Sequence, residues 1–311
     1  MPTLNWNMSI AGGIVGFIIG LTGMGGGALM TPVLVIFFNV SPAAAVSSDV
    51  VTSLILKPFG GGVHVRNRTV NWRLVRWLMV SSVPTAFAGA YLLDRVIGDD
   101  GGDTIKRLLG AVLVVAAVGI VARLVLQARR KTAPIVAMMD PRLVRPLPTM
   151  AIGAIGGLIV GMTSVGSGSL IIVALTLLYP KLSSKEMVGT DLVQAIPLVG
   201  AAALGHALFG HPKIDLIVSV LVGAIPAVVI GAQLSSRASD RYIRPILCAT
   251  LTISALKLLE PSKDSFNGLI LGLAVAFVIG FAFYYAKDRA ARQATTLQLN
   301  AVERPVLDQT S

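Results

Sequence analysis

Charge and cysteine are both scarce in this sequence, and each shortage excludes a class of protein. Only 13% of the 311 residues are charged, against about 25% in soluble domains, whereas 54% are hydrophobic. This balance excludes an ordinary soluble domain and predicts a polytopic membrane protein. The single cysteine, Cys248, lies in an apolar run, so the chain has no disulfide framework.

Catalytic signatures are missing as well. The sequence has no cluster of metal ligands, no HExxH motif and no nucleophile with a base at a workable spacing. We therefore expect neither an enzyme nor a bound cofactor or metal. An intramembrane enzyme stays open as an alternative because Asp, His and Lys occur inside apolar runs. The net charge is +11, and the Lys and Arg residues that produce it lie in short loops between those runs, as membrane orientation requires. We therefore expect no nucleic-acid partner.

Glycine, in contrast, is abundant and gathers at two matching places. Gly20–Leu29 reads GLTGMGGGAL, and Gly161–Leu170, 141 positions later, reads GMTSVGSGSL. Each stretch lies between two apolar runs that are shorter than the ~20 residues of a straight membrane span. Glycine lets the backbone leave the helix, and a broken helix within a membrane must line a cavity or be buried in protein. Paired breaks in two halves of a chain point to the binding site of a transporter.

The apolar runs repeat in the same order on either side of a basic linker. We predict a first transmembrane repeat over 8–126, a linker over 127–148 and a second transmembrane repeat over 149–259. An extra C-terminal transmembrane helix over 267–286 and a disordered tail over 287–311 follow.

Two of the expected helices have clear start signals. Ser41-Pro42 predicts a helix that continues to Leu56 and becomes irregular at Pro58–Gly62, and Ser183–Glu186 has the spacing of a capping box.

The distribution of Lys and Arg predicts the orientation. The basic loops Arg66–Arg76 and Gln127–Pro148 are expected in the cytoplasm, as are Arg237–Arg244 and the C-terminal tail. The halves are then inverted, which requires each pair of short runs to form a hairpin. Parallel halves with one long broken span remain the competing arrangement. The expected fold is an all-α polytopic protein of the bacterial inner membrane with two inverted repeats, each a glycine-broken hairpin plus about three spanning helices.

Ionisable residues inside apolar runs are costly and usually functional. Asp49 and Asp191 lie 142 positions apart, as do His64 and His206, whereas Lys57 has no counterpart. Each aspartate either holds neighbouring polar groups or carries protons, and these four residues are the candidates for proton coupling. Lys57 is expected to pair with Asp49 or to contact an anion, while snorkelling to the interface is a third possibility.

The glycine breaks are the predicted substrate site. In a hairpin, the second short helix begins at the break, and its free N–H groups and dipole attract an anion. Alternatively, the small residues only allow close helix packing. The candidate substrate-binding residues are Thr22, Gly25, Gly26, Gly27, Ser48, Lys57, Thr163, Gly166, Ser167, Gly168, Thr190 and Gln194.

These residues carry a resemblance to a known family. The stretches Gly20–Gly27, Val46–Asp49 and His64 followed by Val70-Asn-Trp72 resemble the TauE/SafE sulfite exporter family, and Val188–Leu192, Gly205-His206 and Ile214-Asp215 fit the same pattern in the second half. The resemblance covers nearly all of residues 8–259. It implies a permease for sulfite, sulfoacetate or related organosulfonates, which exports its substrate, often with the proton gradient. Serine at position 167 and Ser47-Ser48, where Gly-Thr is usual, depart from the pattern and leave the substrate identity open.

The sequence thus predicts a secondary transporter that exports a small anion, most simply sulfite or a sulfonate, by alternating access. Proton coupling is an additional hypothesis. An anion channel and, less favoured, an intramembrane enzyme are the alternatives. The expected partners are a small anion, the lipid bilayer and protons, whereas the oligomeric state stays open.

Overall fold

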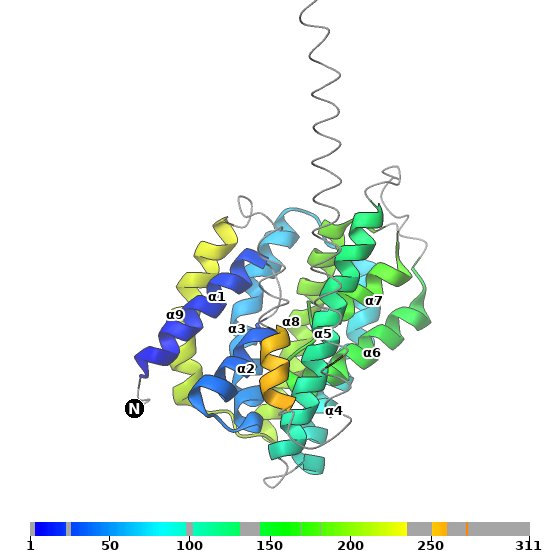
Figure 1. Cartoon of the computed structure of the whole chain (residues 1–311). Coiled ribbons are helices and arrows are strands. Elements are labelled where there is room, and N and C mark those ends of the chain that lie inside the picture. Colours follow the sequence, from blue (N-terminus) through cyan, green and yellow to red (C-terminus); the bar gives the residue numbers. More distant parts are fainter. Residues whose placement is uncertain are drawn as a thin grey trace, which may run out of the picture.

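The computed structural model describes residues 4–22, 26–97, 102–130, 144–168, 170–180, 182–234, 251–259 and Gly272. Every regular element in these ranges is a helix (Figure 1). The labelled helices are α1 (Trp6–Thr22), α2 (Gly27–Phe38), α3 (Pro42–Arg66), α4 (Trp72–Ile97), α5 (Gly102–Arg130), α6 (Pro146–Thr163), α7 (Leu170–Leu178), α8 (Ser184–Leu208) and α9 (Ile214–Leu234). A further short helical segment covers residues 251–259. The predicted all-α architecture is confirmed.

The helices follow the internal repeat that the sequence predicts. Helix α8 begins and ends 142 positions after α3, and α9 begins 142 positions after α4. The breaks fall between α1 and α2 and between α6 and α7. The predicted C-terminal helix and tail lie outside the described residues apart from Gly272, as does most of the predicted linker.

One expected boundary was wrong. Helix α3 does not become irregular at Pro58–Gly62 but continues to Arg66. Two features of its surroundings account for this. Gly61 lies against the side chain of Ile196 in α8, so its small size allows a close approach. A helix that stays at membrane depth must also keep its backbone hydrogen bonds, which favours continuation over a loop.

The two helix starts differ in their capping. Ser183 caps α8 with a complete capping box in which Glu186 takes part, as predicted. Ser41 precedes Pro42 at the start of α3 but makes no side-chain capping bond.

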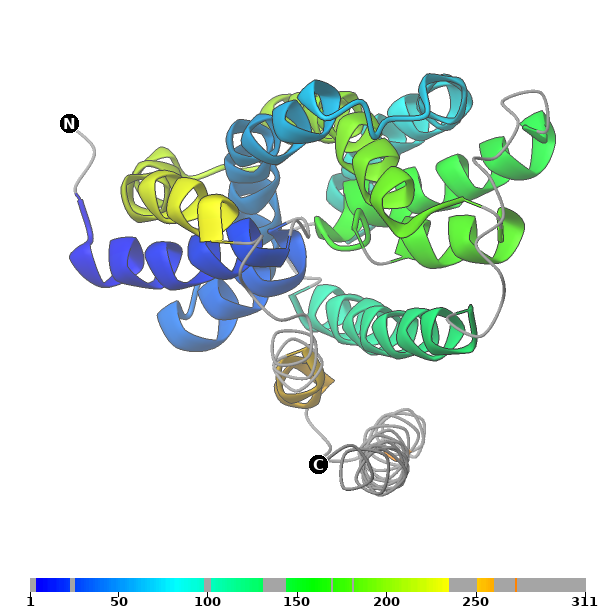
Figure 2. The ribbon, with the colours of Figure 1, turned by 90° about the horizontal axis from the view of Figure 1, so that it is seen from above.

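The first helix of each half packs on the fourth helix of the other half. In α1, Gly12, Gly16 and Gly20 lie against Val220, Ala224 and Val228 of α9, so these two helices run in the same direction. Gly153, Gly157 and Gly161 of α6 lie in the same way against α4. Figure 2 shows α1 beside α9 at one end of the molecule. Glycines spaced by four residues allow this close contact of backbones, as in small-xxx-small packing.

Helices α3 and α8 meet between these two pairs and run in opposite directions. Leu54 of α3 lies beside Gly200, whereas Gly60, further along α3, lies beside Leu192, which comes earlier in α8. At the start of α3, Ser47 reaches His206 near the end of α8. The two helices with matching bounds are therefore antiparallel.

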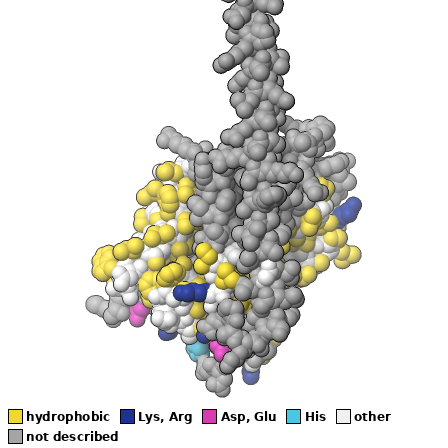
Figure 3. Space-filling model, in the orientation of Figure 1, with side chains coloured by type: hydrophobic (Ala, Val, Ile, Leu, Met, Phe, Trp, Pro, Cys, Tyr) yellow, Lys and Arg dark blue, Asp and Glu magenta, His cyan; other side chains and the backbone are white. Residues whose placement is uncertain are grey.

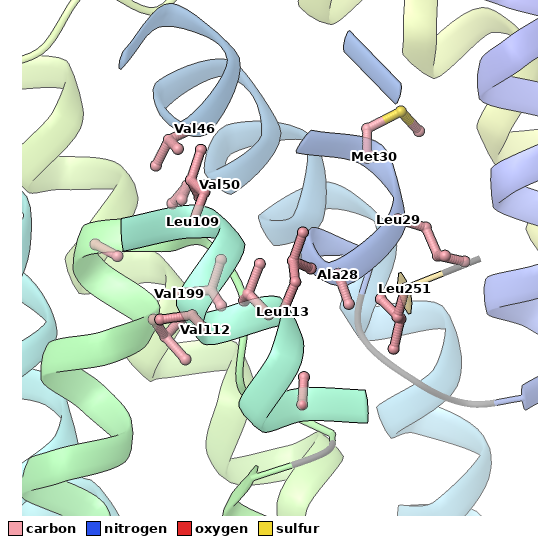
Figure 4. Packing of buried hydrophobic residues seen from close by; sticks show 14 of the residues in the cluster. Ala28, Leu29, Met30, Val46, Val50, Leu109, Val112, Leu113, Val199 and Leu251 are labelled. Atoms are coloured by element: carbon pink, nitrogen blue, oxygen red, sulfur yellow. The ribbon is translucent and has the colours of Figure 1, made fainter. Parts of the chain in front are cut away.

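A buried apolar cluster fixes these elements against α5. Figure 4 shows Ala28 of α2, Val46 and Val50 of α3, Leu109 and Leu113 of α5 and Val199 of α8 close together in this cluster. Leu251, from the short C-terminal segment, also contributes. The cluster holds α2, the helix that follows the first break, firmly against the centre of the molecule.

The outer surface of the described part is strongly apolar. Hydrophobic side chains cover the flanks in Figure 3, and large ones such as Trp6, Phe37 and Ile155 are more than half exposed. Three helical segments in the described ranges are individually long and apolar enough to cross a bilayer: Pro146–Thr163, Glu186–Leu208 and Ile214–Leu234. An exposed apolar surface of this kind suits contact with lipid.

Candidate functional site

Both helices break where the glycine-rich stretches predict. Helix α1 ends at Thr22 and α2 begins at Gly27, while α6 ends at Thr163 and α7 begins at Leu170. Gly25 and the side chain of Thr22 lie outside the described part.

In the second break, the backbone turns through left-handed conformations at Ser164 (φ 59°), Gly166 (φ 128°) and Gly168 (φ 96°). Glycine meets this requirement without strain. The Thr163 hydroxyl donates to the Ile159 carbonyl over 2.6 Å and accepts the Val165 N–H over 3.2 Å. Thr163 therefore stabilises the turn itself.

The two breaks touch each other. Gly27, the first residue of α2, lies so close to Ser164 that a β-carbon there would collide with the Ser164 backbone carbonyl. Gly26 precedes it as the N-cap residue and has no side chain to occupy the helix end. The start of α2 and the end of α6 therefore meet in the buried interior, where backbone groups of both helix ends are directed at one region.

A polar stripe on α3 faces this meeting point. Asp49, Ser53 and Lys57 are spaced by four residues, so they share one face of the helix, and all three are buried. The Asp49 carboxylate accepts a 2.6 Å hydrogen bond from Thr31 of α2, and Ser164 also directs its hydroxyl at it. One helical stripe thus contacts elements of both halves.

Lys57 reaches the second break directly. Its ammonium donates a 2.6 Å hydrogen bond to the hydroxyl of Ser167. It also interacts electrostatically with the carboxylates of Asp191 and Asp49. Both Lys57 and Ser167 are at least 90% buried, so this is a dry contact between α3 and the turn that precedes α7. The prediction that Lys57 lies near the break is consistent with this position.

The position of Lys57 explains why it has no counterpart. Leu54 lies beside Gly200 and Gly60 beside Leu192, so Lys57 sits close to the point where α3 and α8 cross. A second lysine at the equivalent Val199 would approach the first across this crossing, and like charges repel strongly in a low-dielectric interior. Val199 instead belongs to the apolar cluster (Figure 4). The single Lys57 ammonium interacts with an aspartate from each half, Asp49 and Asp191.

Asp191 has different neighbours from Asp49. Its carboxylate accepts a 3.2 Å hydrogen bond from the amide of Gln194, whose oxygen accepts a 3.3 Å hydrogen bond from Ser82 of α4. Gln194 therefore joins α8 to α4, and the Lys57 ammonium also interacts with the Asp191 carboxylate.

The hydroxyls of Ser48 and Thr190 hold the connections that lead into α9 and α4. Ser48 accepts the backbone N–H of Lys213, and Thr190 accepts that of Asn71, each over 3.0 Å. These two contacts are repeat equivalents. Each one satisfies a backbone donor just before a helix, as side-chain caps do.

The histidines make contacts that position helices. His206 is fully buried, and its Nε2 lies 2.8 Å from the carbonyl of Gly161, in the last turn of α6. Because a carbonyl only accepts, Nε2 carries a proton, and Nδ1 can accept from the Ser47 hydroxyl at 3.0 Å. His64 is half-buried, and its Nδ1 lies 2.8 Å from the Thr69 hydroxyl.

Three polar residues that the sequence reasoning missed belong to this region: Thr31, Ser53 and Ser164. Ser53 is the most unusual. The residue is 2% exposed, and its hydroxyl faces Asp49 and the Gly26 position but makes no hydrogen bond of normal geometry within the described residues. Its spacing of four from both Asp49 and Lys57 could have identified it. In the described part of the chain, no three His, Cys, Asp or Glu side chains converge as in a transition-metal site.

Comparison with known proteins identifies related sequences. The family model described as "Sulfite exporter TauE/SafE" matches residues 8–258. The chain is 38% identical over 252 residues to "Probable membrane transporter protein YjnA" of Bacillus subtilis (strain 168), covering 80% of this chain and 98% of the relative. It is 23% identical over 246 residues to "Probable membrane transporter protein YdhB" of the same strain, covering 79% and 96%. A "Probable membrane transporter protein" of Xylella fastidiosa (strain 9a5c) is 27% identical over 239 residues, covering 74% and 84%. No solved structure matches the chain.

Proposed function

Because the chain belongs to the sulfite exporter TauE/SafE family, we propose that it is a secondary transporter that moves a small anion across the membrane by alternating access. Its relatives are named as membrane transporters, which agrees with the apolar surface and with a role other than that of an enzyme. The proposed substrate is sulfite or an organosulfur anion such as a sulfonate, and the proposed direction is export. These choices rest on the family description and on the chemistry of the breaks.

The proposed architecture is an inverted repeat with two broken hairpins. The antiparallel course of α3 and its copy α8 supports inversion. In an inverted repeat, α9 is the copy of α4 and runs antiparallel to it. Because α1 runs parallel to α9, α1 is then antiparallel to α4. If consecutive helices alternate in direction, α1 and α4 are antiparallel only when α2 runs back along α1 as a hairpin. A single long broken span would instead make α1 parallel to α4, so these directions favour hairpins over the parallel-halves alternative.

The observation that carries the proposed site is the contact between the two breaks beside Lys57. The first N–H groups of α2 have no intrahelical acceptors and carry the positive end of the helix dipole. Lys57 adds a full positive charge and already donates to Ser167. An anion that enters between the breaks would replace the Ser167 hydroxyl as the acceptor of this hydrogen bond. The proposed ligands are the Gly26–Gly27 backbone, Lys57 and the Gly166–Gly168 turn.

The charges around the site indicate that a cation accompanies the anion. Asp49, Lys57 and Asp191 are all buried, and together they carry one more negative than positive charge when both carboxylates are ionised. Adding an anion to this region increases the imbalance, which is costly where water is absent. A proton or another cation on an aspartate would remove it. We therefore assign coupling to the aspartates and a positioning role to His64 and His206.

Flux measurements test the proposal. Purified protein in proteoliposomes should transport labelled sulfite or a sulfonate with saturation, and an excess of the same anion on the opposite side should accelerate the exchange. A channel would show flux without counterflow, and an enzyme would change the anion chemically. Thermal unfolding in sulfite, thiosulfate, sulfate, sulfonates and carboxylates identifies the substrate, because a ligand that binds the folded state raises its melting temperature.

A further inference from the structure

The two repeat-related aspartates lie in chemically different surroundings. Asp49 is faced by the hydroxyls of Thr31, Ser53 and Ser164, whereas Asp191 accepts a hydrogen bond from the amide of Gln194, and Lys57 interacts with both carboxylates. A hydroxyl can donate to a carboxylate or turn its lone pairs toward a cation, but an amide NH₂ or an ammonium can only donate. The three hydroxyls around Asp49 are therefore able to turn their oxygens toward a positive ion.

Ser53 provides an independent observation at the same place. Its hydroxyl is buried and directed at Asp49, and it lacks a hydrogen bond of normal geometry among the residues that the structure describes. A buried hydroxyl that is incompletely satisfied costs up to about 1–3 kcal/mol, which is a reason to expect that something else occupies the space it faces.

The adjoining helix end also favours a cation. Ser164 is the C-cap residue of α6, and its side chain faces Asp49, so the negative end of the α6 dipole lies near this carboxylate. In broken transporter helices, half-helix C-termini and unwound carbonyls are the groups that coordinate Na⁺. Hard oxygen donors of this kind suit a hard cation.

The sequence departs from the repeat at these positions. Ser53 is replaced by Ala195 in the second half, and Thr31 aligns with the apolar Ile172 at the spacing of the breaks. Both residues are therefore absent around Asp191.

We propose that Asp49 and the hydroxyls of Thr31, Ser53 and Ser164 form a sodium site. One carboxylate provides enough charge for a monovalent ion, and the hydroxyl oxygens complete a neutral ligand shell. A proton would need only one of these oxygens, so three hydroxyls around one carboxylate favour sodium. The bound ion supplies the positive charge that the proposed anion site lacks; only this coupling role rests on the proposed function, whereas the site itself does not.

Thermal unfolding of the purified full-length protein tests the site without any substrate. Melting temperatures are measured in NaCl, KCl and choline chloride at equal ionic strength. We expect a saturable rise of several degrees in Na⁺ alone. Asp49→Asn should abolish it, while Asp191→Asn, the matched change in the second half, should preserve it. Ser53→Ala, which creates the residue found at position 195, should raise the half-saturating Na⁺ concentration about tenfold.

The sodium site is refuted if the three salts stabilise the protein equally, or if the Na⁺ response survives both Asp49→Asn and Ser53→Ala. It is also refuted if the melting temperature depends on pH in the same way in Na⁺ and in K⁺. Bound Na⁺ would compete with protons for Asp49, so identical curves mean that only a proton binds there. Should Asp49→Asn fail to fold, Ser53→Ala decides the question alone. A parallel series with sulfite and sulfonates separates the two proposals. Stabilisation by an anion without a Na⁺ response refutes the sodium site only. A Na⁺ response without stabilisation by any of the anions refutes anion transport only.

Discussion

At the scale of single residues, the buried polar side chains divide into two groups. Asp49, Ser53 and Lys57 face the meeting breaks, whereas Ser48 and His206 tie helices together elsewhere. The sequence predicts which positions are polar at membrane depth, because each such residue stands out in an apolar run. It does not distinguish the two groups, because Ser48 and Asp49 are adjacent in sequence and face different helices.

Replacing Lys57 tests the anion contact. Lys57→Met should reduce anion binding about 10- to 100-fold, since a hydrogen bond to a charged group contributes about 1.5–3 kcal/mol. The readout is the anion concentration that gives half of the maximal thermal stabilisation. Lys257→Met is the matched control, because Lys257 is an exposed lysine over the Phe37 ring, and it should leave binding unchanged. Equal affinities in the Lys57 variant and the native protein would exclude Lys57 as a ligand.

Replacing His206 separates a positioning role from proton transfer. His206→Leu leaves the Gly161 carbonyl and the Ser47 hydroxyl without their buried partner, so stability should fall by about 2–4 kcal/mol. His64→Leu, at the half-buried equivalent position, should cost less than about 1 kcal/mol, because water can replace its contact. Thermal unfolding provides the comparison. An unchanged melting temperature together with a lost pH dependence of flux would instead identify His206 as a proton carrier.

At the scale of elements, close helix packing and helix interruption use glycine in different ways. The stripes on α1 and α6 let two backbones touch, whereas Gly166 and Gly168 adopt backbone angles that favour glycine. The sequence predicts the breaks because the flanking runs are too short to span. It does not reveal that Gly12, Gly16 and Gly20 face α9, since a glycine stripe carries no information about its partner.

Two neighbouring glycines on α1 provide a matched test of this packing. In Gly16→Ala the new β-carbon would lie 2.7 Å from the Ala224 carbonyl oxygen, so we expect a loss of about 1–3 kcal/mol. At Gly13 the nearest atom would be 3.6 Å away, and alanine favours the helix, so Gly13→Ala should be neutral or stabilising by up to about 1 kcal/mol. Melting temperatures in detergent compare the two. Similar effects would mean that α1 does not pack on α9 through this face.

At the scale of the whole molecule, the repeat brings each half into contact with the other at equivalent places. The α1–α9 and α6–α4 pairs are repeat equivalents, and so are the Ser48–Lys213 and Thr190–Asn71 contacts. Lys57, Ser53 and Thr31 interrupt this symmetry near the breaks. This asymmetry suits the proposed transport of one anion with one cation, because the two ions need opposite charges facing them.

Thiol labelling tests the inverted arrangement. In a Cys248→Ser background, Arg66→Cys and Lys213→Cys place one thiol at the exposed end of α3 and one just before α9. An impermeant thiol reagent should label position 66 only from the cytoplasmic side and position 213 only from the outside, since α3 lies between them. Right-side-out and inside-out vesicles provide the two directions. Labelling of both positions from one side would favour parallel halves.

The sequence by itself determined the membrane class, the repeat, both helix breaks and most polar positions, because apolar run length, glycine content and intramembrane charge are all properties of the linear chain. Only the tertiary structure decided that α3 continues through Pro58, that Ser53 faces Asp49, and that Lys57 reaches Ser167 across 110 positions. Such contacts depend on which helix faces lie against each other. That choice is made by the packing of whole surfaces, and no local pattern of residues contains it.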